Sequence, residues 1–297
     1  MARLIRFAPQ LGQWLTQNLE QGTPVHSLVE TMCQQGMAAS SAQAIVAAYV
    51  AARERGVPTP VDSIDLPDDL PDAAPAPMRL APGTRIAAGD REIVVHMRSG
   101  DPVVATLGNV MDAEECQALI EMARPRLARS TLVDPTSGHD VVSDQRASRG
   151  MFFRLEENAF IARIDRRLSL LMNLPLENGE GLQVLHYPEG AGSDPHFDYL
   201  QPTNAANRDS IRRSGQRTST LVTYLNDVPA GGQTLFPALG WAVSPLRGNA
   251  VYFEYADDHG RVDARSLHAS APVAQGEKWV VTKWMRQRRF VPAGTPA

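Results

Sequence analysis

A proline- and aspartate-rich run between residues 57 and 85 most constrains how this chain of 297 residues can fold. Proline lacks a backbone N–H donor and has a fixed φ, so neither a helix nor a central strand persists through such a run. The run predicts an extended, semi-rigid linker between a domain of residues 1–56 and a domain of residues 86–297. Its members include Pro58, Pro60, Asp62, Asp65, Pro67, Asp68, Asp69, Pro71, Asp72, Pro75, Pro77 and Pro82.

Residues 1–56 carry apolar side chains at helical spacing in three stretches, which predicts a small all-α unit. Gly36 and Gly56 are placed to end the second and third helices in the left-handed conformation. The segment has four arginines, three glutamates and no lysine, so it lacks the basic surface of a DNA-binding domain. We expect a packing, dimerisation or substrate-docking module. The apolar positions are Leu4, Phe7, Leu11, Leu15, Leu19, Val25, Leu28, Val29, Met32, Cys33, Ile45, Val46, Tyr49 and Val50.

The composition of the whole chain narrows its environment and its partners. A formal net charge of -4 argues against a general nucleic-acid or membrane-surface partner. No apolar stretch is long enough to cross a bilayer, and the first residues lack the long apolar run of a signal peptide. Cys33 and Cys116 are the only cysteines, too few for a disulfide framework. Two reduced thiols are typical of a cytoplasmic protein, and we expect that location.

The second domain begins with a strand, continues with two helices and ends in a long series of strands. Residues 92–97 predict a strand, and Asp112 with Glu115 forms a capping-box pattern that starts a helix. Another helix is expected from Glu157 to just before Pro175. After it, the apolar period changes from 3.6 to 2 and stays there. This order predicts an α+β, mainly β domain, with helices packed outside an antiparallel sandwich closed like a barrel.

His196, Asp198 and His268 are candidate metal ligands. Residues i and i+2 of a strand point to the same face, so His196 and Asp198 can aim at one point from one strand. His268 then adds a second imidazole. Two imidazoles and one carboxylate suit Fe(II) and leave three coordination positions open. A His-x-Asp pair alone is common in surface loops, so the motifs around it decide its meaning.

Several motifs in a fixed order make residues 182–290 resemble the catalytic domain of the prolyl 4-hydroxylase α-subunit type of Fe(II)/2-oxoglutarate dioxygenase. The resemblance extends weakly upstream to about residue 102 and does not include the first 80 residues. It implies a double-stranded β-helix, or jelly roll. The motifs that carry it are Leu182–Tyr187, His196–Asp198, Arg217–Asn226, Gly231–Pro237, His268, Gly276–Trp279 and Lys283–Trp284.

The resemblance also implies a set of residues that bind the cosubstrate 2-oxoglutarate. Lys278 is the expected anchor for the far carboxylate, because a buried lysine needs an anionic partner. Trp284 shares its strand face, whereas Lys283 is expected to face solvent. The alternative is an ordinary surface lysine at the start of a strand. Tyr187, Tyr224 and Thr234 complete the expected cosubstrate-binding set.

Arg217 and Arg286 are the candidate substrate-binding residues. The family places a substrate-binding arginine at the position of Arg217, although a solvated loop arginine is an equally good interpretation. Family members often have a histidine where this chain has Arg286. The polar segment 201–216 is expected to form a lid loop that orders on the substrate. His259, beside two aspartates, is interpreted as a solvated loop residue rather than a ligand.

Together these features predict an Fe(II)- and 2-oxoglutarate-dependent hydroxylase that forms succinate and CO2. By resemblance it acts on a peptidyl or protein proline and uses L-ascorbate to keep its iron reduced, with no catalytic residue beyond the metal centre. Asp198 favours hydroxylation over halogenation, because related halogenases carry a small residue there. Two alternatives stay open: a hydroxylase of a free amino acid or small molecule, and a catalytically silent barrel used as a binding module.

Overall fold

The computed structural model describes residues 3–35, 37, 39–66, 78–129, 131–133, 140–142, 148–257 and 261–293. The chain divides into two compact units, residues 1–74 and 75–297, and each is described by itself. Within these ranges, no helix has the length and apolar character needed to cross a membrane.

Three helices form most of the first unit: α1 (Pro9–Glu20), α2 (Val25–Gln34) and α3 (Ala39–Arg55). Proline suits the first turn of α1, where its missing N–H would have no helical partner. Gly56 follows α3 with a φ of 64°, as expected for a helix end, whereas Gly36 lies outside the described residues. The helices bury one cluster, made of Leu15, Leu19, Leu28, Met32, Ala42, Ile45, Val46, Tyr49 and Ile64.

The prediction of an all-α unit ending at residue 56 is wrong. Strand β1 (Arg3–Arg6) pairs antiparallel with β2 (Ser63–Leu66), which falls inside the predicted linker. Ile64 of β2 is buried in the cluster of the helices, so this segment is tied to the unit. These strands were not predicted because four residues are too few to show an apolar period of 2. Neither β1 nor β2 contains a proline, so both can pair despite the prolines on either side of β2. Residues 67–77 of the predicted linker lie outside the described residues.

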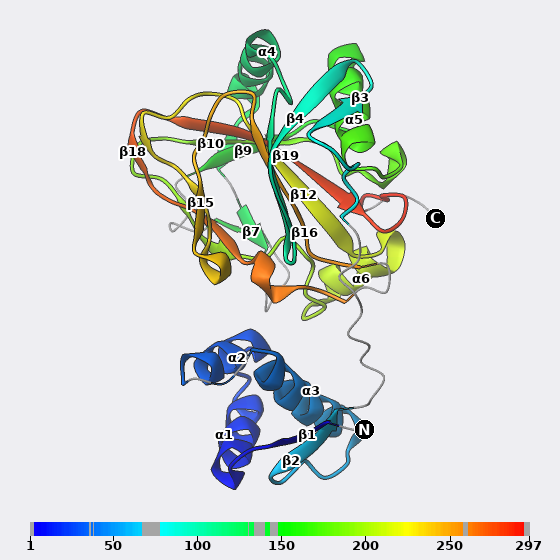
Figure 1. Ribbon diagram of the computed structural model, residues 1–297, viewed down its shortest axis with the longest axis vertical. Coiled ribbons are helices and arrows are strands. Elements are labelled where there is room, and N and C mark those ends of the chain that lie inside the picture. The colour runs from blue at the N-terminus through cyan, green and yellow to red at the C-terminus, as the bar shows by residue number, and fades with distance from the viewer. Residues whose placement is uncertain are drawn as a thin grey trace. The chain divides into compact units, whose positions relative to one another are not determined.

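A nine-stranded antiparallel sheet is the frame of the second unit (Figure 1). Its spatial order brings strands from both halves of the unit together, so that most neighbours are distant in sequence. From one edge to the other, the strands are β3 (Arg85–Ala88), β4 (Arg91–Gly100), β5 (Val103–Gly108), β16 (Ala250–Glu254), β12 (Arg217–Tyr224), β19 (Lys278–Arg286), β10 (Gln183–Tyr187), β9 (Arg149–Phe152) and β6 (Ala128–Arg129).

A four-stranded antiparallel sheet faces this frame, and apolar side chains from both sheets meet in one cluster. Val280 of the large sheet and Phe236 of the small sheet are both in that cluster. The small sheet consists of β11 (Ser193–His196), β17 (His268–Ser270), β14 (Thr234–Phe236) and β15 (Trp241–Val243). Two further pairs are β13 (Ala230–Gly231) with β18 (Val273–Gln275), and β7 (Thr131–Val133) with β8 (Asp140–Val142).

Helices α4 (Ala113–Ala123) and α5 (Ala159–Leu171) cover the other face of the large sheet, where a second apolar cluster lies. The predicted capping box is confirmed: the Glu115 N–H donates to Asp112 Oδ1 at 2.8 Å, and the Asp112 N–H donates to Glu115 Oε2 at 3.1 Å. Short 3-10 turns are η1 (Arg124–Arg126), η2 (Leu176–Asn178), η3 (Pro237–Leu239) and η4 (Ala264–Ser266).

The expected lid loop at residues 201–216 contains a helix, α6 (Ala205–Ser214). Its N-cap residue Asn204 accepts a hydrogen bond from the Asn207 N–H at 2.8 Å, and Gly215 ends the helix with a φ of 74°. The segment reads as a loop because Ile211 is its only large apolar residue. Capping residues, and not an apolar stripe, mark its ends.

The prediction that Lys283 is solvated is wrong. Its side chain is fully buried, and its Nζ lies 2.7 Å from Asp165 Oδ1 of α5 and 2.7 Å from the Glu180 carbonyl oxygen. Every residue of β19 is buried, because helices cover one face of the large sheet and the small sheet covers the other. A strand covered on both faces loses the alternation of polar and apolar residues from which exposure is inferred.

We predict that Lys283→Met lowers the free energy of unfolding by about 3–5 kcal/mol, because it leaves the Asp165 carboxylate buried without its cation. Urea unfolding measures this loss, and adding Asp165→Leu to Lys283→Met should recover part of it. Arg166→Gln on the exposed side of α5 is the matched control and should change stability by less than about 0.5 kcal/mol. Equal stability of Lys283→Met and wild type would contradict the prediction.

We also predict that residues 75–297 fold without the first unit, because both apolar clusters of the second unit are internal to it. The truncation must retain Arg79, whose backbone N–H donates to buried Glu254 Oε1 at 2.6 Å. A cooperative thermal transition by circular dichroism is the measurement. An insoluble or non-cooperative product would show that the first 74 residues are part of the catalytic core.

Candidate active site

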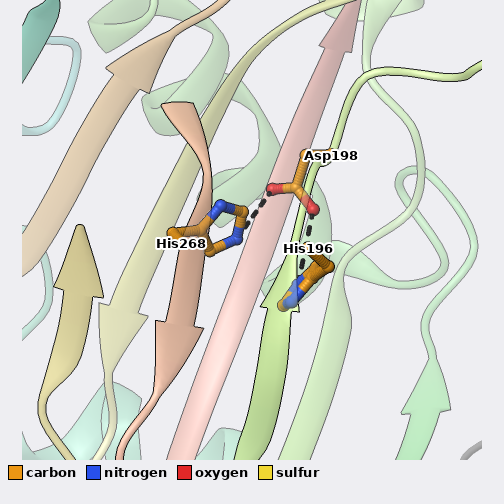
Figure 2. A group of neighbouring side chains, drawn as sticks. All are labelled: His196, Asp198 and His268. Atoms are coloured by element: carbon orange, nitrogen blue, oxygen red, sulfur yellow. Dashed lines mark ion pairs between the residues drawn. The ribbon is translucent and has the colours of Figure 1, made fainter. Parts of the chain in front are cut away.

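The three predicted metal ligands converge between the two sheets (Figure 2). His196 at the end of β11 pairs in register with His268 at the start of β17, so the two imidazoles lie side by side. One donor atom from each of the three side chains lies within 4.8 Å of the others. No other such group of three gathers in the part of the chain that the structure describes.

One detail of the prediction is wrong: His196 and Asp198 do not lie on one strand. Strand β11 ends at His196, and Asp198 stands in a bend two residues further on. The bend still turns the carboxylate toward both rings: Asp198 Oδ1 is 4.0 Å from His196 Nε2, and Asp198 Oδ2 is 3.6 Å from His268 Nε2. The prediction that the two side chains face the same point is confirmed, but a bend in the backbone, and not the alternation of a strand, brings them together.

Backbone carbonyls fix which nitrogen each histidine presents. His196 Nδ1 donates to the Asp194 carbonyl oxygen at 2.8 Å, and His268 Nδ1 donates to the Ser266 carbonyl oxygen at 3.0 Å. With Nδ1 protonated, each ring turns a lone pair on Nε2 toward Asp198. This is the arrangement by which proteins orient imidazole ligands of a metal. The donor set therefore fits Fe(II), with two imidazole nitrogens and one carboxylate.

Asp198 is buried and is held in its charged form. Burial opposes ionisation, but electrostatic interactions with His268, His196 and Arg217 outweigh it and lower the pKa of Asp198 to about 2. Thr220 Oγ1 donates to Asp198 Oδ2 at 2.7 Å and also contacts the Tyr255 hydroxyl at 2.9 Å. Neither supporting role was predicted, because Thr220 lies on β12 and Tyr255 lies just after β16, both well separated from Asp198 in sequence.

Lys278 lies buried between the two sheets and is 2% exposed. It is opposite Tyr187 in the pairing of β19 with β10, and its Nζ is 5.2 Å from the Tyr187 ring centre and 5.8 Å from that of Tyr224. Its Nζ donates to Ser270 Oγ at 2.8 Å. Burial lowers the pKa of Lys278 to about 7, since no carboxylate within the described ranges pairs with it.

Tyr224 and Thr234 meet beside Lys278, as predicted: the Tyr224 hydroxyl lies 2.8 Å from Thr234 Oγ1. Ser270, which the sequence did not single out, joins them from β17 of the small sheet. The group therefore offers a buried ammonium and three hydroxyls at one place. Such a set suits a carboxylate, which can accept from all of them.

Trp284 lies on the same face of β19 as Lys278 but about 20 Å further along, at roughly 3.3 Å for each residue of a strand. It cannot share a small carboxylate with Lys278. The Arg217 guanidinium carbon lies 4.0 Å from the centre of the Trp284 ring, and the ring centre of half-exposed Phe152 lies 6.3 Å from it. The structure therefore places Trp284 with the candidate substrate residue Arg217 and away from the cosubstrate pocket.

Arg217 and Arg286 meet at one carboxylate. Arg217 Nε and Nη2 donate to the two oxygens of Glu180 at 2.7 and 2.8 Å, and Arg286 Nη1 donates to Glu180 Oε1 at 3.2 Å. Arg286 is 1% exposed, so it does not face an open substrate site. Glu180 was not predicted, because it lies just outside the motifs that drew attention.

Comparisons with known proteins agree with this geometry. The family model described as the 2OG-Fe(II) oxygenase superfamily matches residues 182–286. Prolyl 4-hydroxylase 1 of Arabidopsis thaliana is 38% identical over 205 residues, which cover 64% of this chain and 71% of that protein. Probable prolyl 4-hydroxylase 10 of the same plant is 35% identical, with coverage of 66% and 73%.

Among solved structures, the viral collagen prolyl hydroxylase of Paramecium Bursaria Chlorella virus-1, in its 2OG complex, is similar with a TM-score of 0.48. It is 26% identical in sequence, and the match covers 62% of this chain and 95% of that one. The family model matches the region that holds His196, Asp198 and His268. This chain belongs to the prolyl 4-hydroxylase-like family of 2OG-Fe(II) oxygenases.

Proposed function

We propose that this chain is an Fe(II)- and 2-oxoglutarate-dependent hydroxylase that acts on proline within a peptide or protein. One observation carries the proposal: the side chains of two histidines and a buried carboxylate converge, and the buried ammonium of Lys278 bonds to Ser270 of the same small sheet that carries both histidines. Relatives named prolyl 4-hydroxylase at 35–38% identity support proline as the substrate.

We propose that the two facing antiparallel sheets form a double-stranded β-helix. Support comes from the order of the small sheet, in which β11 and β17 pair although they are distant in sequence. In such a fold the ends of strands from both sheets meet around one interior site. Lys278 reaches that interior from the large sheet, and the histidines reach it from the small sheet.

The bound iron would supply the oxidative chemistry that couples decarboxylation of 2-oxoglutarate to hydroxylation. The residues of this chain position the reactants. Lys278, Tyr224 and Thr234 hold the far carboxylate, which leaves the keto acid end free to reach toward the three ligands. The aromatic and aliphatic walls, including Tyr187, exclude water and strengthen each of these interactions.

Proline would enter from the side of Arg217 and Trp284. The Arg217 guanidinium lies over the ring of buried Trp284 and donates to the Asp198 carbonyl oxygen, and extended proline-rich segments dock in grooves lined by aromatic side chains. L-Ascorbate is the expected reductant for iron that becomes oxidised between turnovers. A hydroxylase of a free amino acid is the competing proposal, and hydroxyproline formation from peptide but not from free proline decides between them.

We predict that His268→Ala abolishes both iron retention and succinate formation. The substitution removes one of three ligands and leaves two donors for the metal. Iron content by mass spectrometry and succinate release from 2-oxoglutarate are the measurements. His186→Ala, which removes a histidine bonded to Glu277 away from the three ligands, is the matched control and should retain both.

Full iron occupancy in His268→Ala would remove the metal assignment. Iron retention in the wild type without succinate formation, in the presence of 2-oxoglutarate and a proline peptide, would favour the catalytically silent binding module.

We predict that Lys278→Ala raises the KM for 2-oxoglutarate by roughly two to three and a half powers of ten and leaves iron binding intact. Loss of one partner of a buried charge pair costs about 3–5 kcal/mol, and each 1.4 kcal/mol is about tenfold in affinity. Lys278→Arg should retain part of the affinity, since guanidinium also holds a carboxylate. Titration of 2-oxoglutarate against the iron-loaded proteins measures the effect.

The same lysine gives the wild type a pH dependence. The ammonium form of Lys278 binds the carboxylate. Because its pKa is about 7 in the free protein, Lys278 is mostly neutral above pH 7 and must take up a proton when 2-oxoglutarate binds. The apparent affinity for 2-oxoglutarate should therefore fall as the pH rises from 7 to 9. Lys278→Arg should lose this dependence, because guanidinium stays protonated.

Unchanged affinity for 2-oxoglutarate in Lys278→Ala would show that another group anchors the cosubstrate.

A further inference from the structure

Arg286 has a buried side chain whose contacts lead away from both the iron ligands and the cosubstrate pocket. Its Nη2 donates to the Ser210 carbonyl oxygen at 2.9 Å and to Ser210 Oγ at 2.9 Å, while its Nη1 donates to Glu180 Oε1 at 3.2 Å. Ser210 lies in the middle of α6. One guanidinium therefore bridges a helix and a buried carboxylate, which only a planar group with several donors can do.

Glu180 passes this connection on to Arg217. The carboxylate accepts from Arg217 through both of its oxygens, in the bidentate geometry that fixes direction as well as distance. Arg217 in turn stacks on Trp284, and its Nη1 donates to the Asp198 carbonyl oxygen at 3.3 Å. A continuous path of hydrogen bonds therefore runs from α6 to the backbone of a metal ligand.

Helix α6 depends on such anchors. It has ten residues, and only Ser214 among them is buried. A helix this short is marginal in water by itself, and its stability must come from contacts with the rest of the fold. The side-chain anchors that reach it from the end of β19 are Arg286 at Ser210 and Arg288, whose Nη2 donates to the carbonyl oxygens of Ile211 and Arg212.

We propose that Arg286 is a positioning residue that locks α6 to the Glu180–Arg217 pair, so that α6 is a preset wall of the substrate site before any substrate binds. The effect on peptide binding rests on the proposed function, whereas the anchoring of α6 does not. A preset wall does not have to be ordered when the peptide arrives, so the free energy of ordering is not subtracted from binding. Arg286 acts through Glu180 and α6 and does not itself touch the substrate.

Hydrogen exchange of the metal-free protein tests the structural step without any turnover. The amides of α6 should be protected in the wild type, and Arg286→Gln should raise their exchange rates roughly ten- to a hundredfold, the range expected for loss of a hydrogen bond to a charged group. Arg288→Gln is the matched control, because Arg288 contacts the same helix but not Glu180. Its effect should be confined to the last turn of α6.

Kinetics with poly(L-proline) test the catalytic step. Arg286→Gln should raise the KM for this peptide about tenfold, while succinate release without peptide and the KM for 2-oxoglutarate stay within twofold of the wild type. Arg286→Lys should recover little, since one ammonium on a flexible stem cannot span Ser210 and Glu180 as the guanidinium does. Arg288→Gln should leave the peptide KM within twofold.

The two measurements separate the possible failures. Wild-type exchange rates for α6 in Arg286→Gln, or equal effects of Arg286→Gln and Arg288→Gln along the whole helix, overturn the proposal. A wild type that neither releases succinate nor hydroxylates poly(L-proline) overturns the proposed function, whereas the exchange experiment still decides the role of Arg286. Faster exchange of α6 with an unchanged peptide KM limits Arg286 to stabilising the helix and refutes the preset wall.

Discussion

The pairing of β11 with β17 is the interaction on which the site depends. It sets His196 opposite His268 and turns both rings toward the space between the two sheets. One backbone carbonyl accepts the Nδ1 hydrogen bond of each histidine, so the backbone orients both rings. Asp198 adds the charge from a bend just beyond β11. The small sheet thus contributes the ligands, and the large sheet contributes the lysine and hydroxyls beside them.

Buried charges elsewhere in the second unit show why Lys278 indicates a ligand. Lys283 pairs with Asp165 at 2.7 Å, and Arg167 donates to both Asp90 and Glu115 at 2.6 Å. Lys278 is as deeply buried and is bonded to one serine hydroxyl. An unpaired ammonium in such a place is unfavourable, and its lowered pKa expresses that cost. A bound dicarboxylate would give Lys278 the carboxylate partner that Lys283 and Arg167 already have.

The sequence predicted what short motifs determine and missed what distant segments determine. The triad, the capping box at Asp112 and the grouping of Lys278 with Tyr224 and Thr234 follow from spacing and resemblance, and the structure brings each set together. Glu180 was missed because its partners Arg217 and Arg286 lie on strands far away in sequence, and Thr220 was missed because it reaches Asp198 from another segment of the fold. The buried state of Lys283 was missed because it depends on α5. The cytoplasmic location, the ascorbate requirement and the docking or dimerisation role of the first unit stay predictions.

The position of α6 in the chain explains why its anchoring matters for both halves of the site. Asp198 precedes the helix and Arg217 follows it, so one segment joins a metal ligand to the arginine that stacks on Trp284. Movement of α6 would therefore displace both Asp198 and Arg217. Arg286 and Glu180 resist that movement from β19 and from the segment before β10. In our proposal Arg286 therefore determines how α6 is held beside the substrate site, whereas the candidate iron ligands keep their own support from Thr220 and the two carbonyls.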